Sequence, residues 1–260
     1  MRSVSAALAA GLWMVAATTP AAAAAARAPR EAPESTRADA AAEALANLPP
    51  VSTELAAPNL DPSETVLKLV GWVTKTGDNR GLPFVIIDKI SANVFVFDGD
   101  GAQLGVGPAL LGLAQGDDSV PGIGDRPLAK IQADEKTTPA GRFMAAFGPA
   151  PKGKKVLWVD YDTAISLHPV ITTNPKEHRT QRLKSAEPDD NRITYGCINV
   201  SPAFYNKVVR PAFRDEGGVV YILPEVKAPE QVFPGLRARP TPVQEYRGPS
   251  NKRWRLRLPL

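Results

Sequence analysis

Cysteine and histidine are scarce in this chain, which has one cysteine, Cys197, and two histidines, His168 and His178. The zinc motifs H-E-x-x-H and C-x-x-C are absent, and so is the G-x-S-x-G of many serine hydrolases. A single cysteine also rules out an intramolecular disulfide framework. What remains is one thiol, Cys197, for which either histidine can act as the general base. A cysteine nucleophile with a histidine base needs no metal or organic cofactor.

Long apolar runs are missing after the first 26 residues. Arg2, the stretch "AALAAGLWMVAA" and the alanines of 21–26 are typical of a bacterial secretory signal with A-x-A cleavage sites. An uncleaved membrane anchor is the alternative, but the apolar part is shorter than the ~20 residues that span a bilayer. We therefore expect residues 1–26 to be a signal peptide and the protein to be secreted across the inner membrane into the periplasm.

Charge is nearly balanced, with 31 Lys and Arg against 27 Asp and Glu and a formal net charge of +4. This charge allows peripheral contact with a cell wall or an anionic membrane, whereas the expected compartment disfavours nucleic acid as a partner. Composition then divides the rest of the chain. We expect a disordered Ala/Pro-rich linker at 27–64, one folded domain at 65–224 and a Pro/Arg-rich tail at 225–260.

Apolar, β-branched runs predict that the folded domain is mainly β. The segments "FVIIDKI", "KVLWVDYDTAISLHPV" and "GGVVYIL" are typical of strands, and "ANVFVFDGDGAQLGVG" predicts a hairpin around its Asp-Gly pairs. Between the last two of these strands, "SPAFYNKVVRPAF" predicts a helix with Ser201 as N-cap and Pro202 at its first position.

Cys197 lies in "TYGCIN", between Gly196 and the N-cap of this helix. A thiol is a strong nucleophile once an imidazole or backbone amides favour its thiolate form. Gly196 permits a tight turn, which leaves neighbouring N–H groups to hold an oxyanion. The alternative is a small buried core residue, which is what free cysteines most often are.

Three stretches together resemble the L,D-transpeptidases of bacterial peptidoglycan. "TYGCIN" is similar to the family's cysteine signature at Thr194, Gly196, Cys197, Ile198 and Asn199. "KTTPAGRF" resembles its Thr-Pro-x-Gly-x-Phe segment, and "AISLHPV" resembles the apolar strand that ends in its catalytic histidine. The resemblance covers about 85–223 and implies a strand-rich β-sandwich with a few short helices.

The chain departs from the family pattern in two ways. Tyr195 stands where the family usually has a histidine, and 25 residues separate His168 from Thr194, more than the usual spacing. His178, with 15 residues before Thr194, fits that spacing, but it lies in a polar segment, whereas His168 ends an apolar strand. Because catalytic groups need rigid placement, we expect His168 to be the base.

The resemblance implies acyl transfer from a stem tetrapeptide through a thioester on Cys197, with His168 moving the proton. Thr194, Tyr195, Gly196 and Asn199 are expected to support the site. Arg182 and Arg192, in or next to the charged segment before Thr194, are candidates for binding stem-peptide carboxylates.

The acceptor implied by the resemblance is a diaminopimelate amine, which gives 3-3 cross-links, or a lipoprotein lysine. Water as acceptor would make the protein an L,D-carboxypeptidase or amidase. The third alternative, motivated by Tyr195, is a wall-binding protein without catalysis. Carbapenems, which the family accepts as acyl donors, are the expected probe.

Overall fold

The computed structural model describes residues 57–150, 155–237, 246–247 and 253–254. The strands are β1 (Phe84–Asp88), β2 (Asn93–Phe97), β3 (Gln103–Gly112), β4 (Gly141–Pro149), β5 (Lys155–Asp160), β6 (Ile165–Pro169), β7 (Arg192–Thr194), β8 (Ile198–Val200), β9 (Gly218–Ile222), β10 (Tyr246–Arg247) and β11 (Arg253–Trp254). The α-helices are α2 (Glu64–Thr76), α3 (Arg179–Arg182), α4 (Pro202–Phe204), α5 (Arg210–Phe213) and α6 (Pro229–Val232).

Short 3-10 helices and one π-helical turn complete the described structure. The 3-10 helices are Ile123–Asp125, Leu128–Lys130, Ala133–Glu135, Pro175–Glu177, Pro188–Asn191 and Pro234–Arg237, and the π-helical turn is Tyr205–Val209. The predicted signal peptide at 1–26 and most of the predicted linker at 27–64 lie outside the described residues. The division of the chain into these segments stays a prediction.

The strands predicted from the apolar runs are present. β1, β5, β6 and β9 form where the sequence predicts them, and β2 and β3 form the predicted antiparallel hairpin. At its turn, the Asp98 carboxylate accepts hydrogen bonds from the backbone N–H groups of Asp100 and Ala102, at 3.0 and 2.8 Å. The prediction of a mainly β domain is therefore confirmed.

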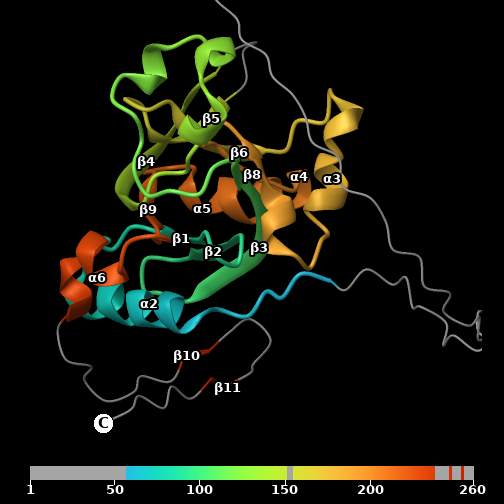
Figure 1. Ribbon diagram of the computed structural model, residues 1–260. Coiled ribbons are helices and arrows are strands. Elements are labelled where there is room, and N and C mark those ends of the chain that lie inside the picture. Colours follow the sequence, from blue (N-terminus) through green and yellow to red (C-terminus); the bar gives the residue numbers. More distant parts are fainter. Residues whose placement is uncertain (1–56, 151–154, 238–245, 248–252, 255–260) are drawn as a thin grey trace, which may run out of the picture. The chain divides into compact units, whose positions relative to one another are not determined.

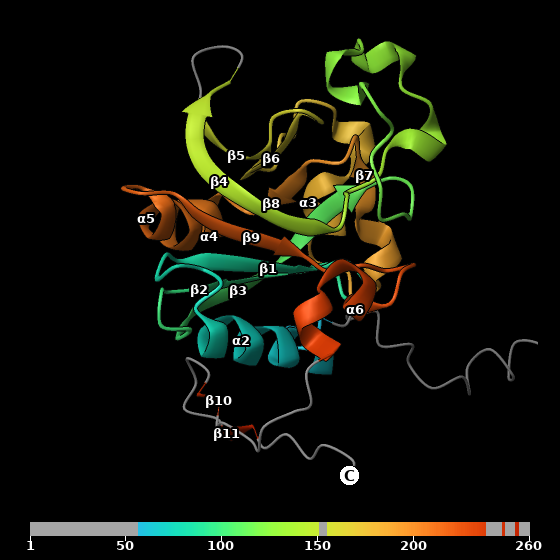
Figure 2. The same ribbon diagram turned by 90° about the vertical axis from the view of Figure 1, so that its left-hand side faces the viewer.

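The predicted β-sandwich is wrong, because the sheet closes on itself as a barrel of eight strands (Figures 1 and 2). The order around it is β2-β1-β9-β4-β5-β6-β8-β3, and β3 returns to β2. Closure depends on the length of β3. Its first part pairs with β2, Ala109 and Leu110 pair with β8, and its last residues pair with β7.

Alternating side chains of β1 supply two separate apolar cores. Val85 and Ile87 belong to the core inside the barrel, while Phe84 and Ile86 point to the opposite side, where α2 packs. Figure 2 shows α2 running beneath β1 to β3. Both faces of β1 are thus covered, which explains why its pattern is apolar throughout and does not alternate.

The segment after β8 is helical and begins as predicted. The Ser201 hydroxyl accepts a hydrogen bond from the Phe204 N–H at 3.2 Å, and Pro202 occupies the first position. This helical segment packs closely on β3, where a Cβ at Gly107 would lie 3.2 Å from the Phe204 ring. Side chains at such positions would push the segment away from the barrel.

Residues 225–237, which the sequence assigned to the tail, pack against the domain in this structure. α6 and the turn after it lie beside α2 (Figure 2). Phe233 is buried in the core between α2 and the strands. Within the described ranges, no helix has the length and apolar character needed to cross a membrane.

A buried cluster of charges joins loops that are distant in sequence. Lys89, which is completely buried, contacts Asp117 at 2.8 Å and Glu225 at 3.3 Å, and its ammonium also donates to the Thr138 carbonyl. Arg192 forms an ion pair with the same Glu225 carboxylate. A buried ammonium is tolerated only when its charge is compensated, and here two carboxylates compensate it.

Asp117 carries much of this arrangement. Its carboxylate accepts backbone hydrogen bonds from Glu225, Val226 and Lys227 in addition to the bond from Lys89. Burial alone would raise the pKa of Asp117, but these bonds and the Lys89 charge outweigh it and lower the pKa from 3.8 to about 2. The carboxylate therefore stays ionised in the folded protein at pH values where it would be protonated in the unfolded chain.

We expect the stability of the domain to fall as pH decreases from about 4 towards 2. A carboxyl group with a lowered pKa in the folded state stabilises the fold above its unfolded pKa, and the contribution is lost as pH falls through the folded value. For Asp117 this amounts to about 2 kcal/mol. Chemical denaturation at pH 7 and pH 2 measures it, and Asp117→Asn should lose this part of the pH dependence.

At pH 7 we expect Asp117→Asn to cost about 3 kcal/mol, because it leaves the buried Lys89 with Glu225 alone. Asp118→Asn is the matched control, since its pair with Lys227 is largely exposed and contributes little. Equal stability of the two variants at pH 7 would contradict this role for the cluster.

Candidate active site

The site is formed by two neighbouring parallel strands, β6 and β8. Their register pairs Leu167 with Ile198 and His168 with Asn199. Leu167 and Ile198 point into the barrel core, so alternate side chains face outward. The outward-facing side chains on this wall are Ser166, His168, Cys197 and Asn199.

The Cys197 thiol is half-buried and lies at the edge of this wall. Its sulfur is 3.6 Å from the Ser166 hydroxyl and 3.6 Å from the Ala164 carbonyl oxygen. Burial raises the pKa of the Cys197 thiol, but its interaction with the neighbouring His168 imidazole, with further bonds from Ser166, outweighs that effect. The net pKa lies below the ordinary value of a thiol, which favours the nucleophilic thiolate.

His168 is held at both ring nitrogens. Nδ1 lies 2.8 Å from the Pro169 carbonyl, which can only accept, so Nδ1 carries the proton in the neutral ring. Nε2 lies 3.0 Å from the amide nitrogen of Asn199, which can only donate. The ring is thus oriented beside the thiol with its Nε2 lone pair directed to Asn199.

His178 lies elsewhere, exposed in the segment between β6 and β7. It follows the short helix at Pro175–Glu177, in a left-handed conformation with φ 48°. It also lines a hollow of about 210 Å³ formed by that segment itself. His168 is thus a neighbour of Cys197, whereas His178 lines a separate hollow, and the choice of His168 as the base stays a prediction.

The charged segment between β6 and β7, residues 170–191, is more than a solvated loop. The Arg179 guanidinium donates to the Asn199 side-chain oxygen at 2.8 Å and forms an ion pair with Glu177. With the oxygen of Asn199 held by Arg179, its amide nitrogen is the group that faces His168. Sequence reasoning missed this chain of contacts, because no motif marks an arginine that reaches back to a strand.

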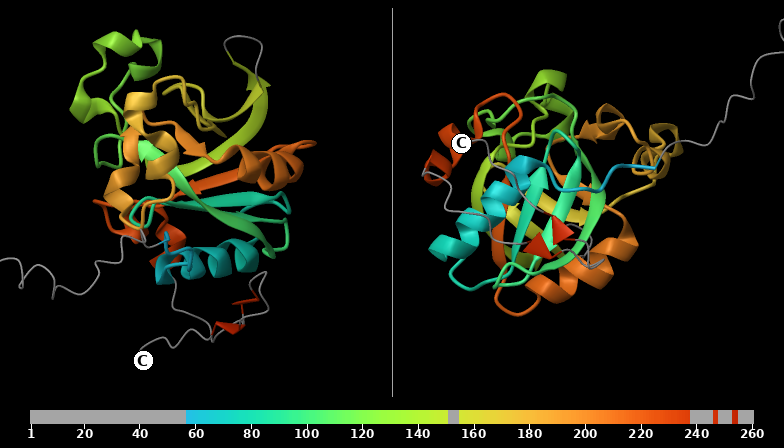
Figure 3. Two further views of the ribbon diagram at one scale, coloured as in Figure 1. Left: turned by 90° about the vertical axis from the view of Figure 1, so that its right-hand side faces the viewer. Right: turned by 90° about the horizontal axis from the view of Figure 1, so that it is seen from below.

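The same segment also covers the outside of β3, as Figure 3 shows. The Asn191 amide donates to the Ala109 carbonyl at 2.9 Å, and Leu183 is buried. The segment is therefore anchored at two points, to Asn199 on β8 through Arg179 and to Ala109 on β3 through Asn191.

The turn before Cys197 accepts only glycine. Gly196 has φ 121°, and a Cβ there would lie 2.5 Å from the Thr137 carbonyl oxygen. The Thr194 hydroxyl accepts from the Gly196 N–H at 3.1 Å and donates to the Cys197 carbonyl at 2.7 Å. Of the amides expected to hold an oxyanion, that of Gly196 is thus already bonded to Thr194, and the oxyanion role stays a prediction.

Thr138, in the "KTTPAGRF" stretch, ties this turn to the buried charge cluster. It is fully buried, its hydroxyl donates to the Gly196 carbonyl at 2.9 Å and accepts from the Gly112 N–H at 2.9 Å. Its own carbonyl accepts from Lys89. The sequence predicted a turn leading into a strand here, and β4 does begin at Gly141, but the pattern did not reveal this tie.

The two arginines expected to bind substrate have internal partners. Arg182 donates to the carbonyl oxygens of Glu177 and Asp190, at 3.0 and 2.6 Å, and Arg192 is ion-paired with Glu225. Their role in substrate binding stays a prediction. Tyr195, by contrast, is 38% exposed, and the Lys136 ammonium lies 4.1 Å from the centre of its ring.

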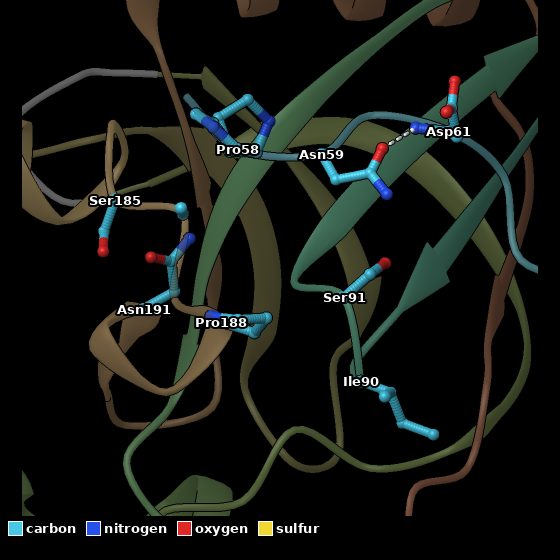
Figure 4. A pocket seen from close by; sticks show the side chains of 10 residues that line it. Pro58, Asn59, Asp61, Ile90, Ser91, Ser185, Pro188 and Asn191 are labelled. Atoms are coloured by element: carbon cyan, nitrogen blue, oxygen red, sulfur yellow. Dashed lines mark hydrogen bonds between the residues drawn. The ribbon is translucent and has the colours of Figure 1, made fainter. Parts of the chain in front are cut away.

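Figure 4 shows a second hollow, of about 290 Å³. It is lined by residues before α2, by the turn at Ile90 and Ser91, and by the end of the charged segment around Asn191. Neither Cys197 nor His168 lines it. Within the part of the chain that the structure describes, no group of three or more His, Cys, Asp or Glu side chains is placed to hold a metal ion.

Comparison with solved structures finds several L,D-transpeptidases. An L,D-transpeptidase from Mycobacterium smegmatis is 18% identical over 54% of this chain and 58% of its own, with a TM-score of 0.29. The helical cell shape determining protein Pgp2 from Campylobacter jejuni is 15% identical over 60% of this chain and 55% of its own, with a TM-score of 0.38. The chain thus spans less than two thirds of either protein.

The catalytic domain of the E. faecium L,D-transpeptidase is 15% identical over 55% of this chain and 98% of that domain, with a TM-score of 0.31. No model of a protein family matches the chain, and no curated protein matches it. Because the TM-scores and identities are low, the function proposed below rests on the sequence motif and on the geometry of the site.

We expect Cys197 to react with iodoacetamide at a lower pH than a free cysteine does. The thiolate is the reactive form, so the midpoint of the rate profile should lie below ~8.5. In His168→Ala the midpoint should rise, because burial then acts on the thiol without the opposing imidazole. His178→Ala serves as control and should keep the parent midpoint. A His168→Ala profile identical to that of the parent would contradict the assigned pairing.

Proposed function

We propose that this chain is a cysteine acyltransferase of the L,D-transpeptidase type, acting on peptidoglycan stem peptides in the periplasm. The observation that carries the proposal is the placement of Cys197, within the "TYGCIN" motif, beside His168 and Ser166 on adjacent strands. A thiol with a lowered pKa beside an oriented imidazole is what nucleophilic acyl transfer requires. The periplasmic localisation is inferred from the signal-peptide pattern of residues 1–26.

The first half-reaction forms a thioester. The Cys197 sulfur attacks the carbonyl carbon of the third residue of a donor tetrapeptide, and the thiol proton passes to His168 Nε2. The carbon–nitrogen bond to the terminal D-Ala then breaks, and the proton moves from His168 to the departing amine. In the resting structure the Asn199 amide donates a hydrogen bond to Nε2. This bond must break before Nε2 can accept the thiol proton.

The second half-reaction releases the acyl group. An acceptor amine attacks the thioester carbonyl and gives its proton to His168, the carbon–sulfur bond breaks, and Cys197 takes the proton back. A diaminopimelate amine as acceptor gives a 3-3 cross-link, and a lipoprotein lysine is the other amine of the proposal. Thiolate and imidazole suffice for this chemistry, which therefore needs no metal or organic cofactor.

We expect a carbapenem to form one covalent adduct with the protein, detected by intact-mass measurement. The adduct should be absent in Cys197→Ala. In His168→Ala its formation should slow by ~100-fold to 10,000-fold, the usual contribution of a positioned general base. His178→Ala should acylate at nearly the parent rate, because His178 lies exposed in the charged segment between β6 and β7.

The reverse pattern, with His178 essential and His168 dispensable, would overturn the assignment of the base. Near-ultraviolet circular dichroism of each variant separates slow chemistry from a folding defect. A parent protein that binds peptidoglycan but never acylates would instead favour the non-catalytic alternative.

We expect the purified protein to join two diaminopimelate-containing tetrapeptide muropeptides into a 3-3 linked dimer, with release of one D-Ala. Mass spectrometry of the products identifies the linkage, and Cys197→Ala should give none. An added amine such as glycine amide should compete as acceptor. Conversion to the tripeptide alone, with or without added amine, would sink the transferase proposal and establish water as the acceptor.

A further inference from the structure

Lys136 lies at the rim of the thiol site. It directly precedes Thr137 and Thr138, the residues that pack against Gly196. Its ammonium lies over the Tyr195 ring, 4.1 Å from the ring centre. Tyr195 in turn is two residues from Cys197 and 38% exposed. A cation is therefore held over an exposed ring that is only two residues from the nucleophile.

Other cations near the site are already paired with carboxylates. Arg179 pairs with Glu177, Arg192 with Glu225, and Lys89 with Asp117. Lys136 differs from them, because no carboxylate of the described residues forms an ion pair with it.

The acidic neighbour of Lys136 in the sequence is occupied elsewhere. Glu135 accepts two hydrogen bonds from the Arg126 guanidinium, at 3.0 and 3.1 Å, and one from the Gln132 N–H at 2.9 Å. This bonding directs the Glu135 carboxylate to Arg126 and leaves the Lys136 charge to an outside anion.

We propose that Lys136 and Tyr195 form a subsite that binds a carboxylate of the acyl donor next to Cys197. The inference rests on the proposed function and adds to it the group that recognises the donor. The ring face attracts the ammonium, which limits the rotamers that Lys136 samples and reduces the entropy lost on binding. The remaining ammonium protons face outward, where a carboxylate can accept them.

The pairing also explains why tyrosine suits this position. A histidine here, as in the resembling family, would become cationic on protonation and repel Lys136, whereas the face of a phenol ring attracts a cation. Tyr195→Phe keeps that face, so it should keep the subsite. The two residues joined by the bond that breaks each offer it a carboxylate, one at the terminal D-Ala and one on diaminopimelate.

The first test compares two reagents that alkylate Cys197, anionic iodoacetate and neutral iodoacetamide, and needs no enzymatic activity. A cation near the thiol attracts the anionic reagent but not the neutral one, and its effect on the thiolate is common to both, so Lys136→Gln should lower the iodoacetate-to-iodoacetamide rate ratio by about fivefold. Rising salt should lower the parent ratio in the same way. Tyr195→Phe should preserve the ratio and Tyr195→Ala should reduce it.

Lys207→Gln is the matched control, because Lys207 is an exposed lysine on the helical segment after β8. Its ratio should equal that of the parent. An unchanged ratio in Lys136→Gln, in a variant shown by circular dichroism to be folded, would overturn the subsite.

The second test uses donor tetrapeptides and separates the two carboxylates. For the natural donor, Lys136→Gln should raise KM by about tenfold with little change in kcat. Amidation of the carboxylate that the subsite binds should raise the KM of the parent about tenfold, and Lys136→Gln should then raise KM no further. Amidation of the other carboxylate should leave the parent KM unchanged, and Lys136→Gln should still raise it. If Lys136→Gln raised KM by the same factor for the natural donor and for both amidated donors, the proposal would be overturned. If no donor reacts with the parent, the proposed function fails, and the alkylation ratio alone decides on the subsite.

Discussion

The need to compensate one buried ammonium organises the loops around the site. Lys89 is fully buried, so Asp117 and Glu225 must lie beside it to compensate its charge. The two loops that carry these carboxylates are thereby held in place. The ammonium also binds the Thr138 carbonyl, whose residue holds Gly196 through its hydroxyl. The position of the cysteine turn is therefore set by a charge-balance constraint in the interior, transmitted through two hydrogen bonds.

The strand register sets the chemistry of the outer wall. Parallel pairing of β6 with β8 puts His168 level with Asn199 and brings Ser166 to the Cys197 sulfur. Arg179 then determines which end of the Asn199 amide faces the imidazole. The thiol thus gains its lowered pKa from neighbours on the rigid sheet, while the covering segment fixes the orientation of the imidazole.

Local patterns predicted much of the fold and the centre of the site. Apolar runs and turn residues located the hairpin, β6 and the Ser201 cap. The motif singled out Cys197 and the apolar strand singled out His168, and their catalytic roles stay predictions. The barrel was missed because closure depends on β3 pairing with two partners far apart in sequence. The contacts of Lys89 and Arg179 were missed for a related reason, since isolated charges carry no periodic signal of their distant partners.

The reactive groups stand on the outside of the barrel wall, and the core inside is filled by apolar side chains. A substrate does not have to thread into an enclosed chamber to reach the sulfur. If the proposed function holds, a glycan strand that continues far beyond the enzyme in both directions can be approached side-on. The enzyme could then act at any free stem peptide of an already assembled network, without needing a chain end.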